Sequence, residues 1–200
     1  MKFLKEFKEF NYEVITEASH DGRPGKLFVK GIIQRADVLN QNGRIYPRDI
    51  LFKEMENYKK IVAERRATGE LDHDDQPVVN LKNVSHLITE VWTEGNDVYG
   101  KLEILPTPMG NIARALLESN VKVGISSRAL GSVQSRGDAD VVQDDLHLIC
   151  WDLVSEPSTH GAFMMREARE YSKEEVRKLI SQADRVNKVA NEILGLKGKR

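Results

Sequence analysis

Three short segments of this 200-residue chain carry side chains suited to proton transfer or nucleophilic attack. The first is the polar sequence GELDHDD at residues 69–75, which contains His73. Imidazole titrates near neutral pH, so His73 is a candidate general base. Two other interpretations stay open: a solvated acidic loop, and a metal site built from Asp72, His73, Asp74 and Asp75. The metal site ranks lower because no second histidine lies at ligand spacing.

The second segment, GISSRALGS at residues 124–132, holds a serine pair in a predicted strand whose alternate side chains point to opposite faces. Ser127 would share the apolar face with Ile125. Ser126 and Arg128 would point to the other face, which makes Ser126 the preferred candidate nucleophile and Ser127 the alternative. A polar strand end that leads into a glycine turn, without any catalytic role, explains the same residues.

The third segment, CWDLVSEPS at residues 150–158, places Asp152 among apolar residues of a predicted strand. Carboxylates are rarely buried without a partner, so Asp152 is a candidate to orient and charge-stabilise a histidine. An edge-strand aspartate that faces water is the alternative. His86, beside apolar residues of another predicted strand, is expected to be structural, although it could compete with His73 as the base. Together His73, Ser126 and Asp152 would supply base, nucleophile and orienter.

Apolar spacing and turn signals predict the elements that position these residues. The phenylalanines and leucine within residues 3–10 repeat at helix-like spacing, which predicts a short amphipathic N-terminal segment. Helices are expected from Pro47 to about Arg66, from Pro108 onward, and from Ser172 onward. Strands are expected at residues 27–33, 85–93, 98–105, 121–127, 141–142 and 146–154.

These elements predict a β-rich α+β fold, because strands and helices do not alternate regularly enough for a doubly wound sheet. We expect a flexible segment at residues 1–24, a compact domain at 25–165 and a helical tail at 166–200. The amphipathic stripe of that tail is suited to docking on a partner helix or on its own domain.

The composition excludes several protein classes. Hydrophobic residues make up 40% of the chain, which argues against disorder. The formal net charge of -1 provides no basic excess, so we expect no direct nucleic-acid binding. The single cysteine, Cys150, cannot form an internal disulfide, which indicates a reduced, intracellular protein. We expect no membrane association, because no apolar run approaches the roughly 20 residues of a membrane span and the first residues do not form a secretory signal.

Five blocks of the chain, in order, resemble the prohead core proteases of T-even-type tailed phages, distant relatives in fold of herpesvirus capsid-maturation proteases. The blocks are residues 39–47, 69–73, 95–105, 124–132 and 151–158. The resemblance implies a β-barrel-like core ringed by helices. It also implies a serine endopeptidase, without cofactor or metal, that trims scaffold, core and coat proteins inside the immature head in the host cytoplasm. A non-enzymatic capsid scaffold or assembly protein with the same fold is the alternative, and the oligomeric state is left open.

The resemblance also assigns roles to individual residues. It makes His73 the base, Ser126 the nucleophile and Asp152 the third member of the site. Backbone N–H groups from Arg128 to Gly131 would bind the oxyanion.

Proteases that resemble this family prefer to cut after glutamate, with Leu or Ile two residues earlier and a small residue following. Three positions of this chain come close to that pattern: Glu17, Glu167 and Glu118. We expect early self-cleavage after Glu17, later cleavage after Glu167 at the junction with the tail, and only slow cleavage after Glu118, which ends a predicted packed helix.

Overall fold

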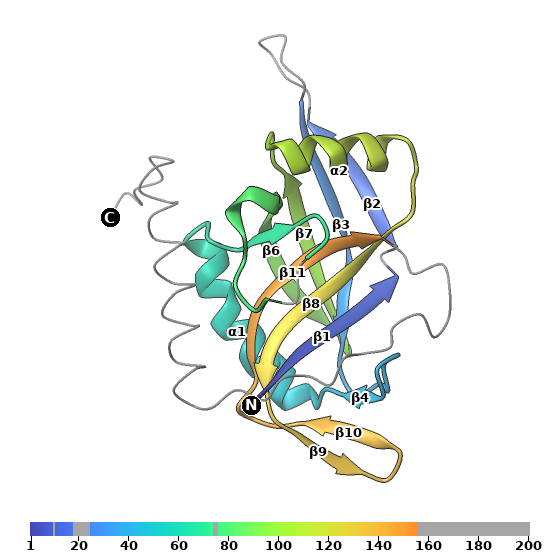
Figure 1. The fold of residues 1–200 in the computed structure, drawn as a ribbon, viewed down its shortest axis with the longest axis vertical. Coiled ribbons are helices and arrows are strands. Elements are labelled where there is room, and N and C mark those ends of the chain that lie inside the picture. Colours follow the sequence, from blue (N-terminus) through green and yellow to red (C-terminus); the bar gives the residue numbers. More distant parts are fainter. Residues whose placement is uncertain (10, 18–24, 74–75, 156–200) are drawn as a thin grey trace.

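The computed structural model describes residues 1–9, 11–17, 25–73 and 76–155 (Figure 1). The described chain is mostly β, with eleven strands, two α-helices and one short 3-10 helix. In chain order the elements are β1 (Lys2–Glu9), β2 (Tyr12–Glu17), β3 (Lys26–Arg35), β4 (Arg44–Ile45), α1 (Arg48–Ala63), β5 (Thr68–Glu70), η1 (Leu81–Asn83), β6 (Val84–Glu94), β7 (Asp97–Ile104), α2 (Pro108–Glu118), β8 (Val123–Gly131), β9 (Val133–Arg136), β10 (Ala139–Val142) and β11 (His147–Ser155).

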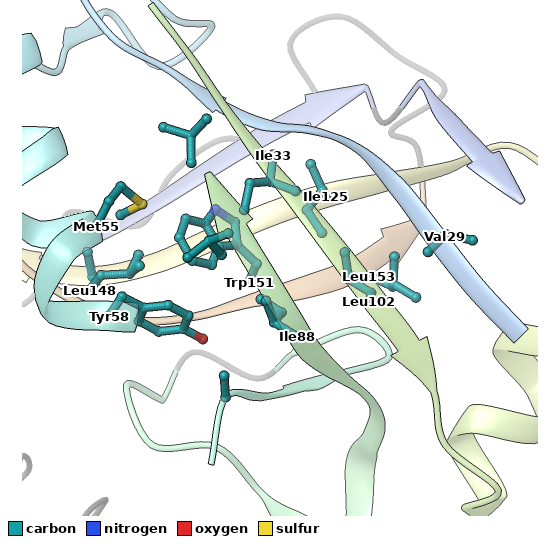
Figure 2. Close-up of a cluster of buried hydrophobic side chains, with 14 of the residues drawn as sticks. Val29, Ile33, Met55, Tyr58, Ile88, Leu102, Ile125, Leu148, Trp151 and Leu153 are labelled. Carbon is teal, nitrogen blue, oxygen red and sulfur yellow. The ribbon is translucent and has the colours of Figure 1, made fainter. Parts of the chain in front are cut away.

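Two sheets lie across one another with the main hydrophobic core between them (Figure 1). One sheet has the order β1-β8-β11, and the other has the order β2-β3-β7-β6-β5. Figure 2 shows the core side chains that meet here, including Leu102 from β7, Ile125 from β8 and Trp151 from β11. Burial of each such side chain contributes about 1.5–3 kcal/mol, so the sheets are held together mainly by apolar contact. A third, small sheet has the order β4-β10-β9.

The two α-helices begin and pack as their sequences indicate. Helix α1 follows Pro47 and buries Leu51, Met55 and Tyr58, which lie on one helical face. The Tyr58 ring meets the Trp151 ring edge-on, with the ring centroids 4.9 Å apart. Helix α2 is capped by Thr107, whose Oγ1 accepts a 3.0 Å hydrogen bond from the backbone N–H of Gly110. The predicted helix starts near Pro47 and Pro108 are therefore confirmed.

The helix-like interpretation of the N-terminal residues is wrong, because residues 2–9 and 12–17 form strands within the two sheets. Strand β1 pairs antiparallel with β8 over its whole length, from Lys2 opposite Gly131 to Glu9 opposite Gly124. The apolar spacing matched a helix, but strand pairing satisfies the backbone polar groups along one side of β8. Residues 2–9 and 12–17 therefore belong to the two large sheets and not to a separate flexible segment.

The C-terminal part of the chain lies outside the described residues, and with it the helix predicted from Ser172. The division into a domain at 25–165 and a tail at 166–200 stays a prediction. Within the described residues, no helix combines the length and apolar character needed to cross a membrane.

Candidate active site

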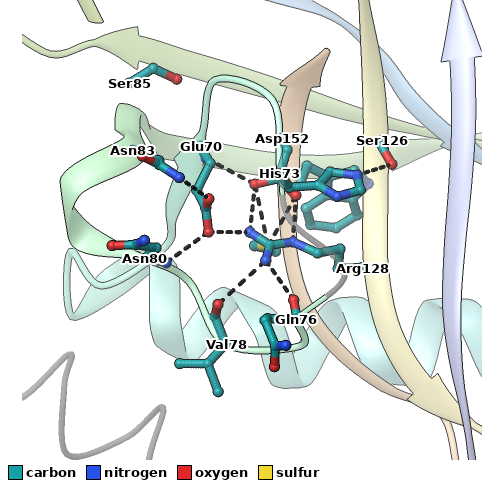
Figure 3. A network of polar contacts seen from close by, with 12 residues as sticks. Glu70, His73, Gln76, Val78, Asn80, Asn83, Ser85, Ser126, Arg128 and Asp152 are labelled. Atoms are coloured by element: carbon teal, nitrogen blue, oxygen red, sulfur yellow. Dashed lines mark hydrogen bonds and ion pairs between the residues drawn. The ribbon is translucent and has the colours of Figure 1, made fainter. Parts of the chain in front are cut away.

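The hydroxyl of Ser126 and the imidazole of His73 lie within hydrogen-bonding distance of one another. Ser126 is in the middle of β8, the central strand of its sheet, and is 4% exposed. The Nε2 atom of His73 lies 3.2 Å from the Oγ atom of Ser126, although the two residues are 53 positions apart in the sequence (Figure 3). This distance is within the reach expected of a base and the nucleophile that it activates.

His73 is placed by a short turn that follows β5 and is tied to the backbone of β11. The N–H of Asp72 donates a 2.8 Å hydrogen bond to the carbonyl of Leu153, and the N–H of Ser155 donates a 3.1 Å bond to Asp72 Oδ1. Asp72 has a φ of 50°, a left-handed conformation that aspartate tolerates better than most residues. The backbone that leads into His73 is therefore fixed on its neighbouring strand.

Asp152 is fully buried, and both of its carboxylate oxygens are occupied by donors. Oδ1 accepts a 2.8 Å bond from the N–H of Glu70 and a 2.9 Å bond from Nη2 of Arg128. Oδ2 accepts a 2.6 Å bond from Nε of Arg128. The sequence predicted that this carboxylate would hold the His73 imidazole, but no hydrogen bond between these two described residues is present. The partners of the Asp152 carboxylate are instead the guanidinium of Arg128, the N–H of Glu70 and the thiol of Cys150.

Arg128 joins two carboxylates in the interior. Besides Asp152, its Nη2 donates a 2.8 Å bond to Glu70 Oε1, and its Nη1 donates a 2.9 Å bond to the carbonyl of Gln76 (Figure 3). Burial acts to lower the pKa of the guanidinium, but the groups around it, including Asp152 and Glu70, outweigh burial and raise the pKa above its usual value. Arg128 therefore stays charged and supports the site through these contacts.

Glu70 is a member of the site that the sequence did not single out. Its side chain is 1% exposed, and its Oε1 also accepts a 2.7 Å bond from the N–H of Asn80. A glutamate beside three nearby aspartates looks solvated, so residue type alone hides it. The neighbouring glycine, Gly69, is the sequence signal that could have pointed to Glu70. A Cβ at Gly69 would lie 2.1 Å from the carbonyl oxygen of Trp151, so the strand that carries Glu70 packs closely against β11.

The oxyanion role predicted for backbone N–H groups between Arg128 and Gly131 has no support in the geometry. Strand β8 is flanked by β1 on one side and by β11 on the other, so its N–H groups point at neighbouring strands. Gly131 itself pairs with Lys2. Of the two residues expected to support the site, Arg128 contacts Asp152 and Glu70 through its side chain.

The alternative candidates, His86 and Ser127, lie in the interior. His86 Nε2 donates a 3.1 Å bond to the carbonyl of Trp151, and Nδ1 accepts a 2.9 Å bond from the hydroxyl of Ser85. Burial lowers the pKa of His86 to about 4, against the opposing influence of Asp152. Ser127 is 3% exposed. These contacts agree with the structural role expected for His86.

The remaining predicted positions are distributed over the fold. Glu17 is the last residue of β2 and Glu118 the last residue of α2, and both are exposed. Glu167 lies outside the described residues. Among described residues, no group of three or more His, Cys, Asp or Glu side chains is arranged to hold a metal ion, and Asp74 and Asp75 are not among them.

Comparison with known proteins identifies the family. A family model described as prohead core protein serine protease matches residues 9–174. The prohead core protein protease of Enterobacteria phage T4 is 36% identical over 125 residues, which cover 58% of this chain and 58% of that relative. The solved structure of the bacteriophage T4 capsid assembly protease matches with a TM-score of 0.72 at 29% identity, covering 78% of this chain and 98% of that one. The chain therefore belongs to the prohead core protein serine protease family.

Proposed function

We propose that this chain is a serine endopeptidase of phage head maturation, with Ser126 as the nucleophile and His73 as the general base. The observation that carries the proposal is the 3.2 Å separation between His73 Nε2 and Ser126 Oγ. Membership of the prohead core protein serine protease family supports the reaction class.

The chemistry follows from that distance. His73 Nε2 takes the hydroxyl proton as Ser126 Oγ attacks the carbonyl carbon of a peptide bond, which forms a tetrahedral intermediate. The imidazolium then gives this proton to the leaving amine as the peptide C–N bond breaks, and an acyl-enzyme on Ser126 remains. Water activated by the same imidazole releases the acyl group and restores the serine. No metal or cofactor has a step in this sequence.

The proposed substrates are the core and capsid proteins of the immature head, inside which the enzyme would act. The phage T4 matches support this assignment, since they are described as a prohead core protein protease and a capsid assembly protease. Cleavage after glutamate, including self-cleavage after Glu17, Glu118 and Glu167, is part of the same proposal.

A quenched fluorescent peptide that spans residues 12–21 tests the activity, because it contains the Ile15-Thr16-Glu17-Ala18 sequence. We expect hydrolysis by the wild-type protein and a fall of roughly 10⁶-fold, to background, in Ser126→Ala and in His73→Ala. His147→Ala is the matched control, since His147 lies at the far end of β11 from Asp152 and pairs with Glu54. Hydrolysis by Ser126→Ala at the wild-type rate would contradict the serine mechanism and favour a non-enzymatic assembly protein.

A further inference from the structure

We propose that Glu70, Arg128 and Asp152 form a positioning cluster that fixes the backbone of residues 70–72 and so holds the His73 imidazole against Ser126. The inference rests on the proposed function, because it takes His73 and Ser126 as the reacting pair. It assigns Asp152 to the support of the turn and not to direct contact with the imidazole.

The hydrogen bonds of Asp152 show how its carboxylate would act at a distance. Its Oδ1 accepts from the N–H of Glu70, three residues before His73, at 2.8 Å. Oδ1 also accepts a 2.9 Å bond from Arg128 Nη2, and Oδ2 accepts a 2.6 Å bond from Arg128 Nε. Burial raises the pKa of the neighbouring Cys150 thiol well above its usual value, so the thiol is protonated, and its Sγ lies 3.5 Å from Oδ2 as a further weak donor.

Arg128 links the strand of the nucleophile to the turn of the base. It lies two residues after Ser126 on β8, so both side chains point to the same face of that strand. Its planar guanidinium reaches Asp152 on β11 and Glu70 at the end of β5 together. A lysine ammonium is a point charge without this fork, so it could not hold both carboxylates in the same way.

The turn itself has little freedom between Glu70 and His73. Leu71 forms a parallel bridge with Leu153, and its N–H donates a 3.0 Å bond to the carbonyl of Asn83. Asp72 is held at both its N–H and its carboxylate by β11. A displacement of about 1 Å at a reacting group can cost on the order of 100-fold in rate, so contacts that fix this backbone act on catalysis.

The first test uses Asp72, because this residue is exposed and its substitution leaves the buried charges intact. Asp72→Asn and Asp72→Gly both accept the left-handed backbone, but only asparagine keeps an oxygen for the N–H of Ser155. The measurement is the rate of Ser126 labelling by a fluorophosphonate, separated into the maximal labelling rate and the concentration for half-maximal labelling. We expect Asp72→Gly to lower the maximal rate about five- to tenfold with the half-maximal concentration unchanged, and Asp72→Asn to restore it to within about twofold. Equal rates in all three proteins would overturn the proposal.

The second test compares Glu70→Gln, Asp152→Asn and the double variant by the same labelling assay. Positioning through one cluster predicts single losses of similar size, unchanged half-maximal concentrations, and a double variant no slower than the worse single variant. Glu54→Gln is the matched control, because Glu54 is a buried carboxylate that accepts a 2.8 Å bond from the N–H of Leu148, at the other end of β11. It should lower stability to heat while the labelling rate stays at the wild-type value.

Direct contact between Asp152 and the imidazole makes the opposite prediction. Asp152→Asn would then lower the labelling rate by about 10⁴-fold, and Glu70→Gln would react like the wild type. The pH dependence of the labelling rate gives a second criterion. A shift of its acid limb to lower pH in Asp152→Asn, but not in Glu70→Gln, would also overturn the positioning role. Failure of the proposed function has a different signature: Ser126→Ala would be labelled as fast as the wild type, which would overturn both proposals together.

Discussion

Ser126 and Asp152 lie directly opposite one another in the antiparallel pairing of β8 with β11, and both are buried. Residues paired in this way point to the same face, so the Ser126 hydroxyl and the Asp152 carboxylate share one side of the sheet. Ser126 lies beside the imidazole of His73, while the carboxylate of Asp152 binds Arg128 and the backbone of Glu70. The sheet therefore holds the proposed nucleophile and the proposed support of its base on adjacent strands.

Loss of the Glu6 carboxylate should destabilise the fold strongly, because Glu6 anchors β1 to the segment before α1. Its Oε1 accepts bonds from Arg44 Nη1 at 2.8 Å and from the Tyr46 hydroxyl at 2.7 Å. Its Oε2 accepts from the amides of Asn40 and Asn42, each at 2.7 Å. Glu6→Gln leaves the guanidinium buried without its counter-charge, so urea denaturation should show a loss of about 3–5 kcal/mol in the free energy of unfolding.

Tyr46→Phe is the control for this measurement, because it removes one neutral donor from the same carboxylate and leaves the ion pair. We expect it to cost about 1 kcal/mol. If Glu6→Gln lowers the free energy of unfolding by less than Tyr46→Phe does, the buried ion pair does not anchor β1.

Local signals predicted the starts of α1 and α2 and favoured Ser126 over Ser127, but they could not predict contacts made at long range. Helix α1 follows Pro47, and strand alternation separates Ser126 from Ser127, because both depend on neighbours in the sequence. The strand at β1 depends on pairing with β8, more than 100 positions away, so its local spacing suggested a helix. In the same way, Glu70 was hidden because its partner Arg128 lies 58 positions along the chain.

Stability should fall with acid in a way that His86 explains. Burial lowers its pKa from 6.5 to about 4, so the unfolded chain binds a proton at higher pH than the folded protein does. The free energy of unfolding should therefore be highest above pH 6.5, decline between pH 6.5 and 4, and level off below, with a contribution of roughly 3 kcal/mol from this residue. Urea denaturation from pH 4 to 7, compared with His86→Gln, isolates that contribution.

Because glutamine does not titrate, the difference in stability between the two proteins should shrink as the pH falls through this range. A difference that is constant from pH 4 to pH 7 would show that His86 does not carry the acid sensitivity.

Gly69→Ala should damage both the fold and the site. A Cβ at this position would lie 2.1 Å from the Trp151 carbonyl oxygen and 2.3 Å from His86 Nε2. These two atoms form a hydrogen bond with each other. We expect a loss of about 3 kcal/mol or more in the free energy of unfolding, with slower fluorophosphonate labelling. Gly100→Ala is the control, because its nearest contact, at 2.9 Å, is the flexible end of Ile33. Equal stability losses in the two variants would contradict the close packing of β5.

Self-cleavage after Glu17 should nick the protein without releasing the first strands. Glu17 is exposed and ends β2, which lies at the edge of its sheet, so we expect the first cut after Glu17. Cleavage after Glu118 should be slow, because the preceding Leu117 is 2% exposed. Cleavage after Glu167 is expected later than the cut after Glu17 and earlier than the cut after Glu118. Denaturing mass spectrometry should find a fragment that begins at Ala18, while native mass spectrometry should find both pieces together.

The two pieces should stay together because β1 remains paired with β8 along its length. The Ser126→Ala protein should stay intact under the same conditions. The same fragment in Ser126→Ala would assign the cut to another protease. Loss of residues 1–17 from the protein under native conditions would contradict the pairing of β1 with β8.

The most direct test of the proposed mechanism is to find which side chain a fluorophosphonate modifies. Wild-type protein is treated with the reagent, digested, and mapped by mass spectrometry. We predict one adduct, on Ser126, which persists in Ser127→Ala and is lost in Ser126→Ala and in His73→Ala. An adduct on Ser127, or an undiminished adduct in His73→Ala, would contradict the assignment of Ser126 and His73 as nucleophile and base.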